Sequence, residues 1–172
     1  MKATELEVIT RVLNDDGLIP NSELPLLIYR GAFEEATAEK IERTFCEHGW
    51  RGTWRNGIYP YHHYHSTAHE VLGCCRGCAR VQFGGEHGVV EELAAGDVVI
   101  IPAGVAHKNL GATNDFAVVG AYPSGQRYDM NYGKPGERPQ ADENIARVPL
   151  PTMDPVLGQQ GPMRRHWRSE KL

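Results

Sequence analysis

The feature that most constrains this chain is a histidine-rich stretch between Gly57 and Gly77. His63 and His65 lie two positions apart in it. Because strand side chains alternate between faces, both imidazoles would project from one face of one strand. Glu70 has the opposite parity and reaches that face only if the chain turns at residues 66–68, where Ser-Thr-Ala can form a short turn. Two converging imidazoles and a carboxylate would suit Fe, Mn, Ni or Zn.

A second stretch, residues 96–107, supplies another histidine. Its short β-branched run 98–101 is typical of a strand buried in a sandwich core. Pro102 and Gly104 indicate a turn after that strand. His107 follows the turn, so its side chain can point back into the core as a fourth ligand.

Together the two stretches resemble the motifs of the cupin superfamily. The residues that match the first motif, with every spacing kept, are Gly57, His63, His65, Glu70 and Gly77. Those that match the second motif are Gly96, Pro102, Gly104 and His107. The second motif ends on an asparagine, and this chain has Gly111 in its place. That departure concerns the turn after the ligand and leaves the ligand itself in place.

The resemblance implies a mainly β fold, a single-domain cupin with a double-stranded β-helix or jelly-roll (RmlC-like) barrel. It also implies one divalent transition metal per chain (Fe, Mn, Ni or Zn), held by His63, His65, Glu70 and His107. The whole chain is similar to the bacterial YjlB-like cupins as well, through residues 26–31, 49–50 and 62–65. That closer resemblance narrows the fold and carries no known reaction.

The length of 172 residues fits one domain with a core of its own. We expect residues 1–56 to form N-terminal strands and a helix that pack on the barrel. Residues 57–133 would form the barrel core with both motifs, and residues 134–172 an extended C-terminal tail over the barrel or a partner subunit. All three parts would belong to one domain.

One N-terminal helix is expected on the outside of the barrel. Ala38, Ile41 and Phe45 form a stripe at helical spacing, Thr37 can cap its start, and His48 followed by glycine is a stop signal. Strands are predicted over residues 5–13, 25–29, 79–83, 89–93, 98–101 and 116–122. Cys75-x-x-Cys78 could be a redox or zinc pair, but we favour small side chains that flank a hairpin turn at Gly77.

Three further residues near the motif are candidates for the second shell or the pocket: His62, Tyr64 and His69. The two histidines have the wrong parity to join the ligands, so we expect them to face outward or to hydrogen-bond to ligands. Either could replace a ligand if the register is shifted by one residue. Other pocket candidates are Arg80, Gln82, Tyr122, Gln126, Tyr128 and Asp129, each of which could equally be ordinary surface.

Charge and hydropathy exclude several kinds of partner. The 18 basic and 22 acidic residues give a net charge of -4 with no basic cluster, so we expect no nucleic-acid or membrane partner. The N-terminus lacks the apolar segment of a signal peptide, and no apolar run reaches the roughly 20 residues that span a bilayer. A cytoplasmic location is therefore expected. We also expect a homodimer, because small barrels often pair their exposed sheet edges.

The predicted site favours a metal-dependent enzyme that acts on a small organic molecule. A metal with open positions can bind O₂ or polarise a carbonyl or enediol, which favours dioxygenase-, isomerase- or decarboxylase-type chemistry, an oxidoreductase or isomerase above all. No residue stands out as the catalytic base. The alternative is a non-catalytic metal-containing module that binds a small ligand, since a fold does not dictate a reaction. A vestigial site is disfavoured because the full ligand set is present.

Overall fold

The computed structural model describes residues 6–168. The described part of the chain contains nine strands and three helices. In chain order these are β1 (Glu7–Leu13), β2 (Ser22–Arg30), α1 (Ala38–Glu47), β3 (Trp50–Asn56), β4 (Glu70–Arg76), β5 (Cys78–Phe83), β6 (Val89–Ala94), β7 (Val98–Ile101), β8 (His107–Ala112), β9 (Ala117–Pro123), α2 (Gln140–Arg147) and α3 (Pro162–His166). The fold is mainly β, as predicted.

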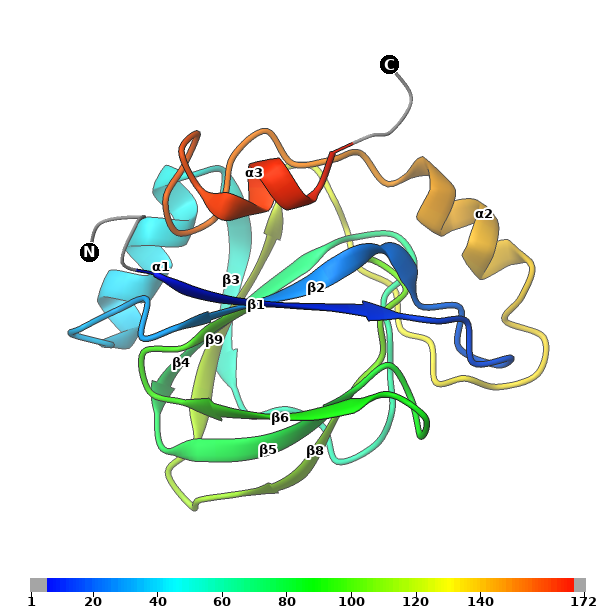
Figure 1. Ribbon diagram of the computed structural model, residues 1–172, viewed down its shortest axis with the longest axis horizontal. Helices are drawn as coiled ribbons and strands as arrows, with labels where there is room; N and C mark the ends of the chain where they lie inside the picture. The colour runs from blue at the N-terminus through cyan, green and yellow to red at the C-terminus, as the bar shows by residue number, and fades with distance from the viewer. Residues whose placement is uncertain (1–5, 169–172) are drawn as a thin grey trace.

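Two antiparallel sheets enclose the barrel (Figure 1). The larger has the order β1-β2-β7-β4-β9-β3, and the smaller has the order β6-β5-β8. Leu72 and Val99 of the larger sheet share one apolar core with Val81, Phe83 and Leu93 of the smaller sheet. The jelly-roll prediction is therefore confirmed, with the core between the two sheets.

The central strands of the larger sheet, β4, β7 and β9, are buried on both faces, which explains the continuous apolar run of β7. Val99 and Ile101 face the barrel interior, whereas Val98 and Ile100 join a second core on the outer face. A strand covered on both sides has no solvent-facing position and so shows no alternation of polar and apolar residues. This is the buried strand that residues 98–101 predicted.

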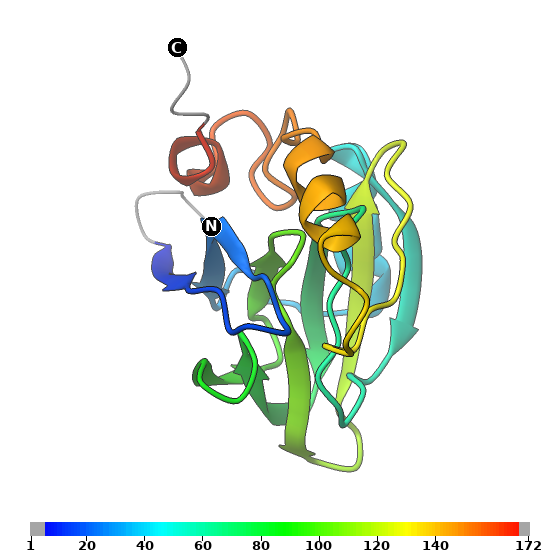
Figure 2. The ribbon, with the colours of Figure 1, turned by 90° about the vertical axis from the view of Figure 1, so that its right-hand side faces the viewer.

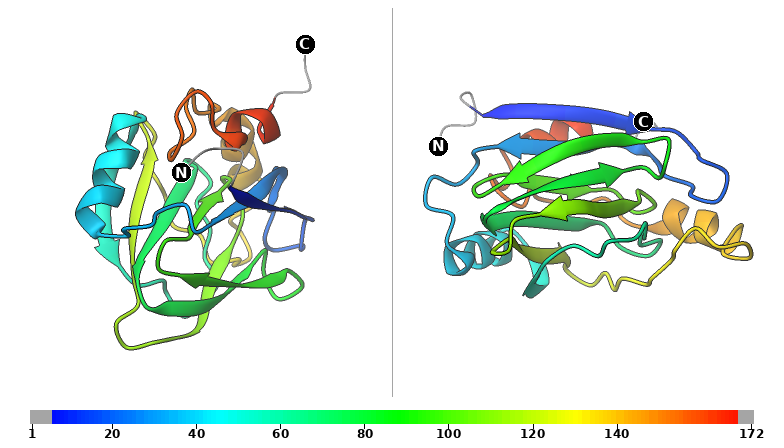
Figure 3. Two further views of the ribbon diagram at one scale, coloured as in Figure 1. Left: turned by 60° about the vertical axis from the view of Figure 1, so that its left-hand side comes forward. Right: turned by 90° about the horizontal axis from the view of Figure 1, so that it is seen from below.

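Helix α1 covers part of that outer face, as predicted (Figure 3). The Thr37 side chain accepts a hydrogen bond from the Lys40 amide at its start, and His48 caps its end. Ile41 and Phe45 are its buried residues. Gly73 of β4 permits the close approach, because a Cβ there would lie 2.7 Å from the Ile41 side chain.

The segment 134–172 differs from the extended tail that the sequence predicted. It contains α2 and α3 within its described part, and Figure 2 shows both beside the barrel. Helix α2 carries acidic residues in its first turn and Arg147 in its last, which suits the helix dipole. Pro162 opens α3, where its missing N–H costs no hydrogen bond. The surrounding glycines and prolines conceal these short helices in the sequence.

The remaining local predictions concern the hairpin and the membrane. Gly77 has φ +68°, which confirms the turn between β4 and β5. All four cysteines are free thiols. Among the described residues, none of the helices has the length and apolar character needed to cross a membrane.

Candidate metal centre

The backbone holds His63 and His107 side by side. His107 opens β8, and the two residues form an isolated antiparallel bridge in which the His63 amide donates to the His107 carbonyl (3.3 Å) and the His107 amide to the His63 carbonyl (2.9 Å). As a result their ring centroids lie 4.0 Å apart. The histidine of the second motif, His107, therefore lies directly beside His63 of the first motif.

The prediction that His63 and His65 lie on one strand is wrong, because the backbone there forms no continuous strand. Within residues 57–69 the structure has only isolated bridges, at His63 and Tyr64. Pro60 has no N–H to give to a ladder, which disfavours a continuous strand here. The side chains of His63 and His65 nevertheless converge, with ring centroids 5.8 Å apart.

The turn predicted before Glu70 is present, and it brings this carboxylate to the histidines. The chain bends at Ser66 and Thr67, where the Ser66 amide donates to the Asp129 carboxylate (2.6 Å). Glu70 then opens β4. Its Oε1 lies 3.3 Å from Nε2 of His65 and 3.3 Å from Nε2 of His107.

A glycine links the second motif to the first. The Gly104 amide donates to the His65 carbonyl (2.7 Å). Gly104 has φ +100°, and a Cβ there would lie 2.3 Å from the Asn21 carbonyl oxygen. Only glycine satisfies this turn without a backbone shift.

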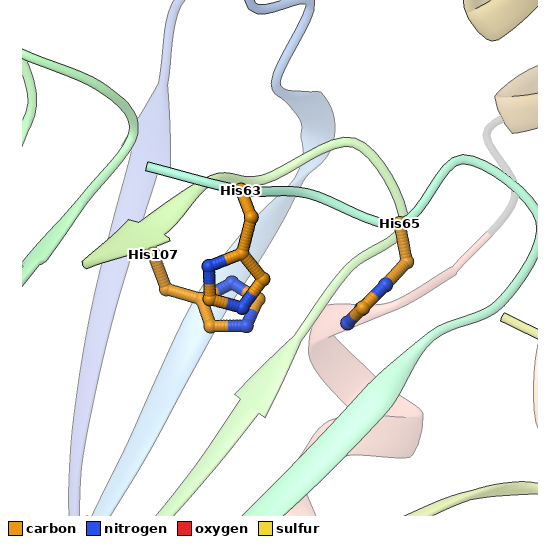
Figure 4. A group of neighbouring side chains, drawn as sticks. All are labelled: His63, His65 and His107. Carbon is orange, nitrogen blue, oxygen red and sulfur yellow. The ribbon is translucent and has the colours of Figure 1, made fainter. Parts of the chain in front are cut away.

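The three imidazoles form a compact buried cluster (Figure 4). One ligand atom from each of His63, His65 and His107 lies within 4.8 Å of the others. These residues are 4%, 6% and 2% exposed, and Glu70 is 2% exposed. Four polar groups are therefore withdrawn from water together, which is costly unless each finds a partner.

A hydrogen bond at Nδ1 fixes the tautomer of each of the three histidine rings. Nδ1 of His63 lies 3.1 Å from the Tyr61 carbonyl, Nδ1 of His65 lies 2.6 Å from the Asp129 carbonyl, and Nδ1 of His107 lies 3.4 Å from the Val105 carbonyl. Since a carbonyl can only accept, each Nδ1 carries the proton and donates. The Nε2 lone pairs of the neutral rings therefore remain free for a metal.

This arrangement places lone pairs against a carboxylate oxygen, because Nε2 of His65 and His107 both face Glu70 Oε1. Such groups attract each other only when a cation, either a proton or a metal ion, lies among them. Three imidazoles and one carboxylate are also donors that divalent transition metals accept. The residues present thus fit a divalent metal.

The electrostatics of the cluster agree with this geometry. Burial and the neighbouring His107 lower the pKa of His63 to about 3. Burial also disfavours the charged form of His65, but the Glu70 carboxylate outweighs burial and raises the pKa of His65. Burial alone would raise the pKa of Glu70, yet His65 and His107 hold that pKa well below its usual range. Glu70 is therefore anionic at neutral pH.

The cluster lies at a cavity of about 510 Å³. Aromatic side chains form much of its wall: Trp54, Tyr59, Tyr122 and Tyr128. Trp54 Nε1 donates to the Tyr122 hydroxyl (2.8 Å). Burial and the negative charge of the nearby Glu70 raise the pKa of Tyr122 far above its usual value, so this phenol keeps its proton.

Comparisons with known proteins identify the family. The family model described as Cupin matches residues 50–128. The chain is 45% identical over 164 residues to "Uncharacterized protein YjlB" from Bacillus subtilis (strain 168). The matched region covers 95% of this chain and 98% of that protein. The chain belongs to the cupin superfamily.

Two solved structures are similar to this cupin at low identity. Acireductone dioxygenase from Bacillus anthracis is 16% identical, with a TM-score of 0.41, over 73% of this chain and 83% of that one. A cupin 2 domain-containing protein from Halorhodospira halophila is 15% identical, with a TM-score of 0.38, over 87% of each chain. Likeness at this level says nothing of activity.

The three further candidates near the motif lie outside the cavity wall of this cupin. Neither ring nitrogen of His62 has a hydrogen-bond partner among residues 6–168. Tyr64 is buried with Ile19 and Ala141, and its hydroxyl donates to Glu137 (3.2 Å). His69 Nδ1 accepts from the Ala103 amide (2.9 Å), which ties the start of β4 to the turn before His107.

Sequence reasoning proposed some wall residues and missed others. Tyr122 and Tyr128 line the cavity, as we suggested, whereas Arg80 and Gln82 are not among its lining residues. Trp54 also lines it. Tyr59 and Met130 were missed, because loop residues show no periodicity that would indicate where their side chains point. The run of aromatic residues before His63 was the available signal for Tyr59.

Proposed function

We propose that this cupin binds one divalent transition metal through His63, His65, Glu70 and His107, and that it is a metal-dependent enzyme acting on a small organic molecule. The observation that carries the proposal is the direction of the Nε2 atoms. Three buried imidazoles with protonated Nδ1 atoms have ligand atoms within 4.8 Å of one another, and the Nε2 atoms of His65 and His107 also face the anionic Glu70. A divalent cation satisfies all four groups at once.

A bound Fe, Mn, Ni or Zn ion would supply Lewis-acid or oxygen-binding chemistry, suited to dioxygenase-, isomerase- or decarboxylase-type reactions. The chain's own residues orient the ligands and shape the cavity. The carbonyls of Tyr61, Asp129 and Val105 hold the rings. The Tyr122 phenol, which keeps its proton, lies on the cavity wall together with Glu70. We propose oxidoreductase or isomerase activity on this basis.

A non-catalytic metal-containing module that binds a small ligand is the second candidate. One observation favours it. Apart from the four proposed ligands, the titratable side chains that line the cavity are Arg55 and three tyrosines. The phenol of Tyr122 is held in its protonated form, so the cavity offers few groups suited to proton transfer near neutral pH.

A turnover assay separates the two candidates. The protein is loaded with each of the four metals and incubated with a panel of small carboxylates, enediols and diketones, while oxygen uptake and product masses are followed. We expect turnover with at least one metal and none with His63→Ala. Stoichiometric binding without any product across the panel would favour the binding module.

We also propose that the chain forms a homodimer in the cytoplasm. Strands β1 and β3 are the edges of the larger sheet, and exposed edges favour pairing with a second copy. Light scattering tests the dimer, and a mass near the 19.1 kDa of one chain would contradict it. Cell fractionation tests the location.

A further inference from the structure

Aromatic rings extend from the proposed ligands to the mouth of the cavity. Tyr59 contacts the His63 ring edge-on, with centroids 5.3 Å apart. Tyr128 contacts the His65 ring in the same way at 5.2 Å and stacks on Tyr122 at 4.9 Å with an interplanar angle of 18°. Tyr59 and Tyr128 are 50% and 52% exposed. These half-exposed rings offer a π-surface that a bound ring would cover.

Two of the polar groups in the wall are already engaged. The Tyr122 hydroxyl accepts from Trp54 (2.8 Å). The Asn56 side-chain oxygen accepts from the Gly57 amide (2.8 Å). A sugar or another polyhydroxylated molecule would bury several hydroxyls and find few partners, at a large desolvation cost. The wall therefore suits a molecule with few polar groups.

The charges of the wall point to a single negative charge on the ligand. Arg55 is the one lysine or arginine side chain among the described lining residues, and its guanidinium is paired with Glu42 (2.6 Å) and Glu39 (3.4 Å) of α1. A divalent metal held by three neutral imidazoles and one carboxylate has a net charge of about +1. One anionic oxygen would neutralise that charge, and a second anionic group would have no free cation to meet.

We propose that the cavity takes a planar aromatic molecule that carries one anionic oxygen-donor group for the metal and no second charge. The aromatic ring lies against Tyr128 and Tyr59, and the oxygen donor reaches the metal. This inference rests on the proposed function, because the metal is the partner of the oxygen donor. Phosphorylated sugars and dicarboxylates are excluded by the same charge argument.

Four hydroxamates with one metal-binding head test the proposal. Benzohydroxamate carries a planar ring, cyclohexanehydroxamate a ring of similar size without π-electrons, acetohydroxamate only a methyl group, and succinate monohydroxamate a second negative charge. Their affinities are measured by calorimetry on Zn²⁺-loaded protein, with metal content determined on each preparation. We expect benzohydroxamate to bind about tenfold more tightly than each of the other three, which is what one or two aromatic contacts contribute.

Variants of Tyr128 assign the preference to the wall. Tyr128→Ala should reduce the preference for benzohydroxamate over cyclohexanehydroxamate to about twofold or less, whereas Tyr128→Phe should keep it, because the ring and not the hydroxyl makes the contact. The matched control is Tyr132→Ala, since Tyr132 is 41% exposed but does not line the cavity. We expect it to leave all four affinities unchanged.

The outcomes separate this inference from the function beneath it. Metal-loaded protein that binds the four hydroxamates equally, or succinate monohydroxamate most tightly, would overturn the aromatic ligand and leave the metal site standing. If Tyr128→Ala keeps the full preference for benzohydroxamate over cyclohexanehydroxamate, Tyr128 does not make the aromatic contact and its assignment is overturned. Protein that takes up none of Fe, Mn, Ni or Zn would overturn the proposed function and this inference with it.

Discussion

Glu70 and Asp154 are both buried carboxylates, 2% and 0% exposed, and their surroundings differ completely. Asp154 accepts hydrogen bonds from the Tyr29 hydroxyl and from the amides of Val156 (2.7 Å), Leu157 (3.0 Å) and Met163 (3.1 Å). Glu70 faces two imidazole nitrogens at 3.3 Å and an open cavity. The first carboxylate is satisfied by its own chain, and the second becomes so only with a cation.

The comparison shows how burial of the same group serves two purposes. Asp154 joins the C-terminal segment to β2, because its partner Tyr29 lies 125 residues away in the sequence. Hydrogen bonds saturate it, so it contributes to stability. Glu70 keeps an oxygen directed at neighbouring ligands, which is typical of a binding site.

The largest effect on stability is expected for Asp154→Ala. This change leaves the amides of Val156 and Leu157 and the Tyr29 phenol without their acceptor, so the free energy of unfolding of the metal-free protein should fall by about 3–5 kcal/mol. Urea denaturation measures it. Glu143→Ala, at an exposed position of α2, is the control and should stay within about 0.5 kcal/mol of the wild type. If Asp154→Ala lowers the free energy of unfolding by less than about 1 kcal/mol, the structural role proposed for this carboxylate is contradicted.

A smaller effect is expected for Glu70→Gln. The amide keeps the size of the side chain and avoids the cost of a buried charge, so the unfolding free energy of metal-free protein should change by only about 1 kcal/mol. Metal content should fall sharply, since a neutral amide is a poor ligand in place of a carboxylate. If Glu70→Gln were as destabilising as Asp154→Asn in the same urea series, the distinction between the two carboxylates would fail.

The sequence predicted the Glu70 region far better than the Asp154 region. The reason is how far apart in the sequence the contacting residues lie. His63, His65, Glu70 and His107 fall in two short stretches whose spacing is itself the pattern. The alternation of β5 and the helical stripe of α1 are local in the same way. The contact between Tyr29 and Asp154 leaves no periodic trace. The loop backbone of residues 57–69 and the cavity positions of Tyr59 and Met130 depend equally on tertiary structure.

An exposed carboxylate extends the comparison and gives the smallest effect. Arg138 pairs with Asp15 (2.6 Å) and Asp142 (2.6 Å). The hydrogen bonds that Asp15 accepts from Arg138 and from the Gly17 amide lower the pKa of Asp15 from 3.8 to about 2. Because the pKa is lower in the folded state, the stabilisation is present above pH 3.8 and is lost as the pH falls through about 2.

We therefore expect Arg138→Ala to cost about 0.5–1 kcal/mol at pH 7, where solvent screens the pair, and less in 1 M salt. Thermal unfolding at pH 7 and pH 3, with and without salt, measures the difference. Arg43→Ala, an exposed position on α1, is the control. A cost of several kcal/mol at pH 7 that salt leaves unchanged would contradict the ranking of the three carboxylates.

The most direct test is the metal content of protein purified without an affinity tag or chelator, measured beside His63→Ala, His107→Ala and the exposed His87→Ala. We expect about one equivalent of a divalent transition metal in the wild type and in His87→Ala. In the two ligand variants the metal content should fall below about one-tenth. Full occupancy in either variant would remove that histidine from the site. Folded wild-type protein that holds no metal and takes none up would contradict the metal centre altogether.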